Sequence, residues 1–301
     1  MDGLAAPLVG APGAAVSAGV GLLELLAERF YKMTGSGNDF VFVDARRSGA
    51  PATVPAEQVA AVCARGTGVG ADGLVLLDQP DAGRVRIAYY NRDGSRASLC
   101  GNATLCAASL AVYLGAVGAG LEFLIETDAG TLAAGVTPGV GPHFAPPTIH
   151  GLQPNVPVPG PGPAAAAERR VGYAVAGVPH LVVEVEDVDA VDVAGRSPAL
   201  RRATVDRPDG ANVNYVSPAG DGRWRMRTFE RGVEQETLAC GTGAVACAAL
   251  LQAWGLTGSR VDLLSKAGHV LRVTSDSGVS DGRLQGEGRL VFVGALIDAG
   301  R

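Results

Sequence analysis

Short hydrophobic runs alternate along the chain with polar turns rich in glycine, aspartate and asparagine. Runs of this length, bounded by turn residues, are typical of strands. They predict strands at residues 40–43, 74–77, 85–90, 121–126, 181–185, 211–216, 224–229 and 270–273. Alanine-rich segments predict helices at residues 56–65, 102–114 and 242–253. This mixture predicts a fold of the α+β class.

Two segments that open with Cys-Gly indicate that one half of the chain repeats the other. Cys100 begins the run Cys-Gly-Asn-Ala-Thr-Leu-Cys-Ala-Ala, and Cys240 begins Cys-Gly-Thr-Gly-Ala-Val-Ala-Cys-Ala-Ala. Each run continues as a predicted helix up to a glycine, Gly115 in the first copy and Gly255 in the second. The two cysteines therefore hold the same position in two copies of one unit.

The repeat extends upstream of the two cysteines. A polar turn and a hydrophobic strand lie 61 residues before Cys100, counted from Asp39, and 60 residues before Cys240, counted from His180. We expect two α+β units that face each other about a pseudo-twofold axis. Both Cys-Gly turns would then lie in the cleft between them, and such clefts are favoured ligand sites.

A segment rich in proline, glycine and alanine, residues 136–170, separates the two copies. It is expected to contain the domain boundary and a surface loop. We predict one domain over residues 29–145 plus 288–301 and a second over residues 146–287. Residues 1–28 are expected to be a poorly ordered N-terminal extension, or the product of an upstream start site, that runs into a short helix at residues 22–29.

The composition narrows the class of protein. The net charge of −5 argues against nucleic acid as a partner, because nucleic-acid-binding proteins present basic surfaces. No apolar stretch is long enough to span a membrane, and no basic segment begins a secretory signal. The five cysteines include no Cys-x-x-Cys pair, so a metal site and a disulfide framework are both disfavoured. We expect a cytoplasmic enzyme with reduced thiols, no metal and no cofactor, acting as a monomer or homodimer.

Cys100 and Cys240 are the candidate catalytic residues. Each stands at the start of a predicted helix, where free backbone N–H groups and the helix dipole stabilise an anion. We expect this position to lower the pKa of each thiol from its free value of about 8.5. The other cysteines, Cys63, Cys106 and Cys247, are expected to be buried apolar residues.

Six motifs in order give the chain a family resemblance over residues 30–301. They are Lys-Met-Thr-Gly-Ser-Gly-Asn-Asp-Phe from Lys32, Gly-Val-Gly-Ala-Asp-Gly-Leu from Gly68, Asn-Arg-Asp-Gly-Ser from Asn91 followed by Cys-Gly-Asn, Asn-Val-Asn-Tyr-Val from Asn212, Glu-Arg-Gly from Glu230, and Glu-Thr-Leu-Ala-Cys-Gly-Thr-Gly from Glu236. In these motifs the chain resembles the diaminopimelate epimerases. The resemblance implies two pseudo-symmetric domains, each a mixed or antiparallel sheet wrapped around a central helix.

The resemblance also implies an activity and a set of site residues. The reaction would be cofactor-independent epimerisation of L,L-diaminopimelate to the meso form, in lysine and peptidoglycan precursor synthesis, with Cys100 and Cys240 as the acid and base pair. Gly101, Asn102, Gly241 and Thr242 would bind the reacting carboxylate through backbone N–H groups and the Thr242 hydroxyl. The substrate would be recognised by Asn38, Asn91, Asn212, Glu230 and Arg231.

Departures from the family pattern keep other readings open. Ala103 and Leu105 replace a glycine and an arginine in the first cysteine motif, and Val178 stands where the family often has a substrate-binding asparagine. The alternatives are a two-thiol racemase or epimerase with another substrate, a non-catalytic amino-acid-binding protein, and a thiol redox protein. A redox protein would use a disulfide between Cys100 and Cys240.

Overall fold

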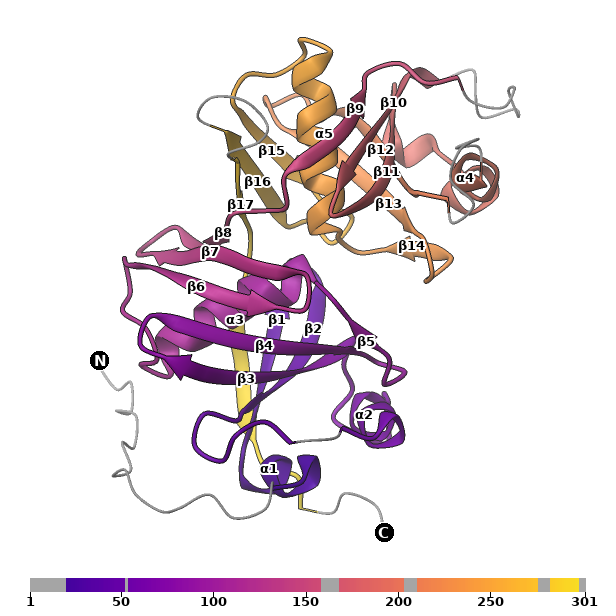
Figure 1. Ribbon diagram of the computed structural model, residues 1–301. Coiled ribbons are helices and arrows are strands. Elements are labelled where there is room, and N and C mark those ends of the chain that lie inside the picture. Colours follow the sequence, from indigo (N-terminus) through magenta and orange to yellow (C-terminus); the bar gives the residue numbers. More distant parts are fainter. Residues whose placement is uncertain (1–19, 52–53, 158–167, 203–209, 276–281, 298–301) are drawn as a thin grey trace, which may run out of the picture.

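The computed structural model describes residues 20–51, 54–157, 168–202, 210–275 and 282–297. Figure 1 shows two bodies, one holding α1 to β7 together with β18, and the other holding β9 to β17. The helices are α1 (Leu22–Glu28), α2 (Ala56–Cys63), α3 (Gly101–Tyr113), α4 (Val193–Arg202) and α5 (Gly241–Ala253), with a 3₁₀ turn η2 (Val188–Ala190).

The first half is a mixed sheet in which each strand pairs with its neighbours in space. Its strands are β1 (Phe30–Gly35), β2 (Asn38–Asp44), β3 (Gly73–Asp81), β4 (Arg84–Asn91), β5 (Arg96–Ala97), β6 (Glu122–Thr127), β7 (Gly130–Thr137), β8 (Gly141–Phe144) and, from the far end of the chain, β18 (Arg289–Gly294). β2 runs parallel to β3, and β4 runs parallel to β6. The other pairings are antiparallel, including that of β18 with β1.

The second half repeats this pattern of pairing. Its strands are β9 (Ile149–Gln153), β10 (Glu168–Ala176), β11 (Val178–Val185), β12 (Asn212–Pro218), β13 (Trp224–Glu230), β14 (Gln235–Thr237), β15 (Arg260–Leu264), β16 (Val270–Ser275) and β17 (Gly282–Gln285). β11 is parallel to β12 and β13 is parallel to β15, as β2 is to β3 and β4 is to β6. The parallel and antiparallel pairs thus occur in the same order in both halves, as the duplicated sequence predicts.

Each half encloses one helix. α3 and α5 are both 13 residues long, and each has ten buried residues spread over all its sides. A helix that is apolar all round is stable only when it is enclosed, and the many alanines let the surrounding strands approach closely. α3 ends before Gly115 (φ 68°) and α5 before Gly255 (φ 71°). The predicted α+β class and the central helix in each half are confirmed.

The segment at residues 136–170 contains more regular structure than its composition suggests. β8 pairs with β7 on one side and with β17 on the other, so it joins the sheets of the two halves. β9 pairs with β10 in the second half. Residues 154–157 are irregular, and residues 158–167 lie outside the described residues.

The N-terminal helix belongs to the folded body. Leu22, Leu25 and Leu26 of α1 are buried and pack in a cluster with Phe30 and Val41. The short helix expected at residues 22–29 is confirmed, and the leucines on one side of α1 cover the sheet. Residues 1–19 lie outside the described part. No helix in the described ranges is long and apolar enough to cross a membrane.

Candidate active site

The two central helices meet end to end at their N-termini. Cys100 caps α3 with φ −134° and ψ 113°, and Cys240 caps α5 with φ −136° and ψ 110°. A β-carbon built on Gly101 would lie only 3.5 Å from the Cα of Gly241. The structure thus brings both Cys-Gly turns to one junction between the halves of the chain.

The pKa of each thiol is raised in the folded protein, so the expected lowering is wrong. Burial raises the pKa of Cys100 to about 11, although the backbone N–H groups of Ala103 and Asn102 act in the opposite direction. Burial also raises the pKa of Cys240, and the charge of Glu230 adds to the effect. The local helix start favours a thiolate. In the folded protein, however, burial destabilises the thiolate more than the backbone N–H groups stabilise it.

Cys240 and Glu230 form one polar cluster at the start of α5. The backbone N–H of Gly243 donates to the Cys240 Sγ at 3.4 Å, and the Thr242 hydroxyl lies 3.6 Å from the same sulfur. The Thr237 hydroxyl donates to Glu230 Oε1 at 2.7 Å. Burial raises the pKa of Glu230, while hydrogen bonds from Thr237 and Cys240 act against this shift. A carboxylate is thereby held beside one thiol.

Asn212 and Arg231 lie together where β12 begins and β13 ends. The backbone N–H of Arg231 donates to Asn212 Oδ1 at 2.7 Å. The Arg231 side chain is half-buried, and no acidic side chain within the described ranges forms an ion pair with it. A guanidinium in this position can bind a carboxylate through two hydrogen bonds.

The remaining predicted residues come from the first half. Asn102 Nδ2 donates to Asn38 Oδ1 at 2.7 Å, which joins the start of β2 to the first turn of α3. Asn91 ends β4 opposite Gly73 and donates from Nδ2 to the Ser95 hydroxyl at 3.0 Å. The bond to Ser95 is exposed, and no hydrogen bond within the described ranges joins the Asn91 side chain to another predicted site residue.

Several polar residues at the junction were not predicted from the sequence. The Tyr89 hydroxyl interacts with the Cys100 thiol. Beneath α5, Asn214 Nδ2 contacts His180 Nδ1 at 3.1 Å, and the Thr228 hydroxyl donates to Asn214 Oδ1 at 2.9 Å. These side chains are polar residues inside otherwise hydrophobic strands, and that interruption is the signal by which they could be found.

Val178 occupies the position in the second half that Asn38 has in the first. Asn38 begins β2 after the turn from β1, and Val178 begins β11 after the turn from β10. The glutamates that follow β13 are held in ion pairs. Glu236 binds Arg227 and Lys266, and Glu234 binds Arg201.

Known structures share this fold at low sequence identity. The structure of a predicted epimerase from Pseudomonas aeruginosa matches with a TM-score of 0.63 and 18% identity, covering 90% of this chain and 99% of that one. A probable proline racemase from Agrobacterium radiobacter matches with a TM-score of 0.64 and 17% identity, covering 90% and 93%. The chain therefore has the fold of these structures.

Sequence comparison identifies the family within this fold class. The sequence model of diaminopimelate epimerase matches residues 30–139 and 172–284. A diaminopimelate epimerase from Gemmatimonas aurantiaca is 48% identical over 278 residues, 89% of this chain and 98% of that protein. One from Aquifex aeolicus is 38% identical over 288 residues, covering 89% and 97%. The chain belongs to the diaminopimelate epimerase family, whose members are isomerases.

Proposed function

We propose that this protein interconverts L,L- and meso-diaminopimelate in lysine biosynthesis, with Cys100 and Cys240 as the two proton-transfer groups. The observation that carries the proposal is the junction of the two helix starts at Gly101 and Gly241. It supports one site that both thiols reach, and this suits a reaction that removes a proton from one face of an α-carbon and returns one to the other face. The 48% identity to a diaminopimelate epimerase over nearly its whole length supports the substrate.

The proposed reaction leaves the protein unchanged apart from the position of one proton. One cysteine, as thiolate, takes the α-proton and becomes a thiol, while the C–H electron pair stays on the α-carbon. The other cysteine, as thiol, donates its proton to the opposite face and becomes a thiolate. The two cysteines exchange roles in the reverse direction, so no external acid, base or redox partner is consumed.

Stabilising the carbanion is the main difficulty, because the α-proton of an amino acid is weakly acidic. In this proposal the backbone N–H groups of Gly101, Asn102, Gly241 and Thr242 bind the reacting carboxylate at the two helix starts. There they stabilise the charge that develops as the proton leaves. A base alone contributes about 10²–10⁴-fold, which makes this electrostatic term necessary.

Binding of the substrate would offset part of the rise in the pKa of the two thiols. The charge of Glu230 raises the pKa of both thiols in the empty site. In the proposal Glu230 binds an ammonium group of the substrate, which neutralises that effect when it is needed. Arg231 binds the distal carboxylate, and the amide side chains of Asn91 and Asn212 complete the recognition of the second amino-acid head. Asn38 takes part in substrate recognition from the first half of the chain. We propose that residues 29–145 plus 288–301 and residues 146–287 are the two domains that close on it.

The test uses wild-type protein and single cysteine variants under reducing conditions. Each is incubated with L,L-diaminopimelate in D₂O, and the meso product and its α-deuterium are measured. Cys100→Ala and Cys240→Ala should each lose epimerisation. Cys247→Ala is the matched control, since Cys247 is a fully buried thiol in the core of α5; it should keep the activity. Wild-type protein that forms no meso product and exchanges no α-proton would refute the proposal.

A further inference from the structure

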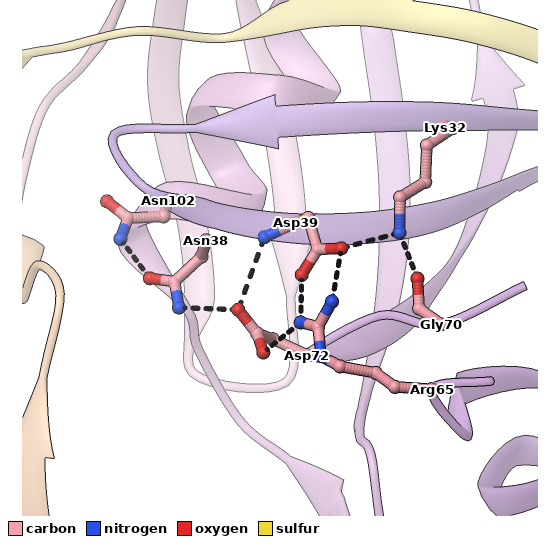
Figure 2. Close-up of polar contacts among 7 residues, drawn as sticks. All are labelled: Lys32, Asn38, Asp39, Arg65, Gly70, Asp72 and Asn102. Atoms are coloured by element: carbon pink, nitrogen blue, oxygen red, sulfur yellow. Dashed lines mark hydrogen bonds and ion pairs between the residues drawn. The ribbon is translucent and has the colours of Figure 1, made fainter. Parts of the chain in front are cut away.

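A chain of hydrogen bonds runs from Asp72 through Asn38 to Asn102. Asn38 Nδ2 donates to Asp72 Oδ2 at 2.9 Å, and Asn102 Nδ2 donates to Asn38 Oδ1 at 2.7 Å. Figure 2 shows these side chains in a row, with the amide oxygen of Asn102 pointing away from Asn38. The chain joins the turn before β3 to the start of β2 and the first turn of α3.

The carboxylate of Asp72 fixes the direction of this row of hydrogen bonds. An ionised carboxylate has only acceptors, whereas an asparagine amide presents either its oxygen or its NH₂ group. Asp72 therefore requires the NH₂ of Asn38, which turns Asn38 Oδ1 toward α3. Asn38 Oδ1 in turn requires the NH₂ of Asn102. Two amides that would otherwise be free to rotate thus take one orientation each.

Basic residues hold Asp72 and its neighbour Asp39 in place. Arg65 donates to Asp72 Oδ1 at 2.9 Å and to Asp39 Oδ1 at 2.6 Å. The buried Lys32 pairs with Asp39 Oδ2 at 2.6 Å. Asp72 Oδ2 also accepts the backbone N–H of Asp39 at 3.3 Å. The carboxylate at the start of the chain is therefore anchored on both oxygens (Figure 2).

The last atom of this row of hydrogen bonds, Asn102 Oδ1, has no hydrogen-bond partner among the described residues. Asn102 is 3% exposed, and its Oδ1 is buried without a hydrogen bond to any described residue. The same oxygen lies 3.9 Å from the position of a β-carbon built on Gly241. A buried acceptor without a donor costs about 1–3 kcal/mol. The acceptor is thus held at the junction of α3 and α5, where the catalytic thiols lie.

We infer that Asp72 is a positioning residue, which through Asn38 holds Asn102 so that its side-chain oxygen accepts a hydrogen bond from the α-ammonium group of the substrate. The inference rests on the proposed function, because it takes the α-carboxylate to be bound at the same helix starts. The ammonium group is attached to the same carbon, so it enters next to that oxygen. Asp72 acts on the substrate only through the two amides.

The first test replaces the acceptor-only carboxylate by an amide of the same shape. In Asp72→Asn the side chain can donate, so Asn38 and Asn102 lose their fixed orientation. KM for L,L-diaminopimelate should rise about 10-fold with little change in kcat, as expected for loss of a contact present in both ground and transition states. The control is Arg65→Gln, which removes the ion pair but leaves the Asp72 carboxylate. Asp72 stays an acceptor that is still held by the backbone N–H of Asp39, so KM should stay nearly unchanged even if the melting temperature falls.

The second test exchanges the side chains at positions 38 and 72. It measures the melting temperature, which needs no substrate. Asn38→Asp alone places two carboxylates in contact and should lower the melting temperature strongly. The double variant Asn38→Asp/Asp72→Asn restores a donor at 72 and an acceptor at 38, which again requires the NH₂ of Asn102. Its melting temperature should recover to that of Asp72→Asn or above it. Independent structural roles would instead make the two losses add.

The outcomes separate this inference from the proposed function. Unchanged KM in Asp72→Asn, an equal rise in Arg65→Gln, or additive losses in the double variant would overturn the inference while the wild-type enzyme remains an epimerase. A wild-type protein without epimerase activity would refute the proposed function. In that case the melting temperatures of the exchange series still show whether Asp72 sets the orientation of the amides.

Discussion

Gly101 and Gly241 lie face to face where α3 and α5 begin, and a β-carbon on Gly241 would not fit without a shift of its neighbours. A β-carbon on Gly241 would lie 3.4 Å from the Cα of Gly101 and 3.1 Å from Leu284 Cδ2. The glycines allow the two helix starts to approach each other, and this approach places both cysteine caps at one site.

The first prediction follows from this contact. Gly241→Ala should lower the free energy of unfolding by about 1–3 kcal/mol, the usual cost of overpacking, and should reduce kcat/KM by moving the helix starts apart. Urea denaturation and steady-state kinetics measure the two effects. Gly258→Ala is the control, since a β-carbon there meets nothing within 4 Å. Wild-type stability and activity in Gly241→Ala would show that the close approach is not required.

Glu230 is predicted to have opposite effects on the empty and the occupied site. Its charge raises the pKa of both thiols, so Glu230→Gln should lower these pKa values and speed alkylation of ligand-free enzyme by iodoacetamide at pH 8. The same change should lower kcat/KM by about 10–100-fold, because a hydrogen bond to a charged group contributes about 1.5–3 kcal/mol.

The control for this prediction is Glu234→Gln. Glu234 lies in the same turn, is exposed and binds Arg201. Both its alkylation rate and its kinetics should match the wild type. Slower alkylation in Glu230→Gln would contradict the assigned electrostatic role.

The fold follows from the sequence more completely than the site does. The repeated Cys-Gly turns and their matching glycines predict two enclosed helices, since that pattern is local. The pairing of β8 with β17 and the strand character of β9 depend on partners far along the chain, and the proline-rich composition of that region hides them. Local sequence cannot show which distant strands will meet.

The pKa values of the site also depend on contacts that local sequence cannot show. A cysteine at a helix start has, from local geometry alone, a lowered pKa. The raised pKa of Cys100 comes from burial, which only the packing of both halves determines. Likewise Asp72 appears in the sequence as one residue of a glycine-rich turn. Its contact with Asn38 is visible only when β2 and the turn before β3 lie side by side.

The buried His180 should make the free energy of unfolding depend on pH below 6.5. Burial, with a further effect of Arg231, lowers the pKa of His180 from 6.5 to about 3. The folded protein therefore keeps this side chain neutral while the unfolded chain takes up a proton below pH 6.5. The stabilising effect is present above pH 6.5 and is lost as the pH falls toward 3.

The variant His180→Gln tests this assignment. The glutamine oxygen can accept from Asn214 Nδ2 as His180 Nδ1 does, but it does not titrate. Between pH 6 and pH 4 the free energy of unfolding should fall less steeply in the variant, by up to about 1.4 kcal/mol per pH unit. Urea titrations at each pH give the two slopes. Equal slopes would mean that His180 is not kept neutral by the fold.

The central claim is that two thiols act on opposite faces of one carbon, and the early isotope pattern in D₂O tests it most directly. L,L-diaminopimelate is incubated with wild-type enzyme, and substrate and product are separated after a small fraction has reacted. The two-thiol account predicts α-deuterium in the meso product and hydrogen in the remaining L,L substrate, because the returning proton comes from the other cysteine. Deuterium appearing in the substrate as fast as in the product would mean that one group removes and returns the proton, and would contradict the account.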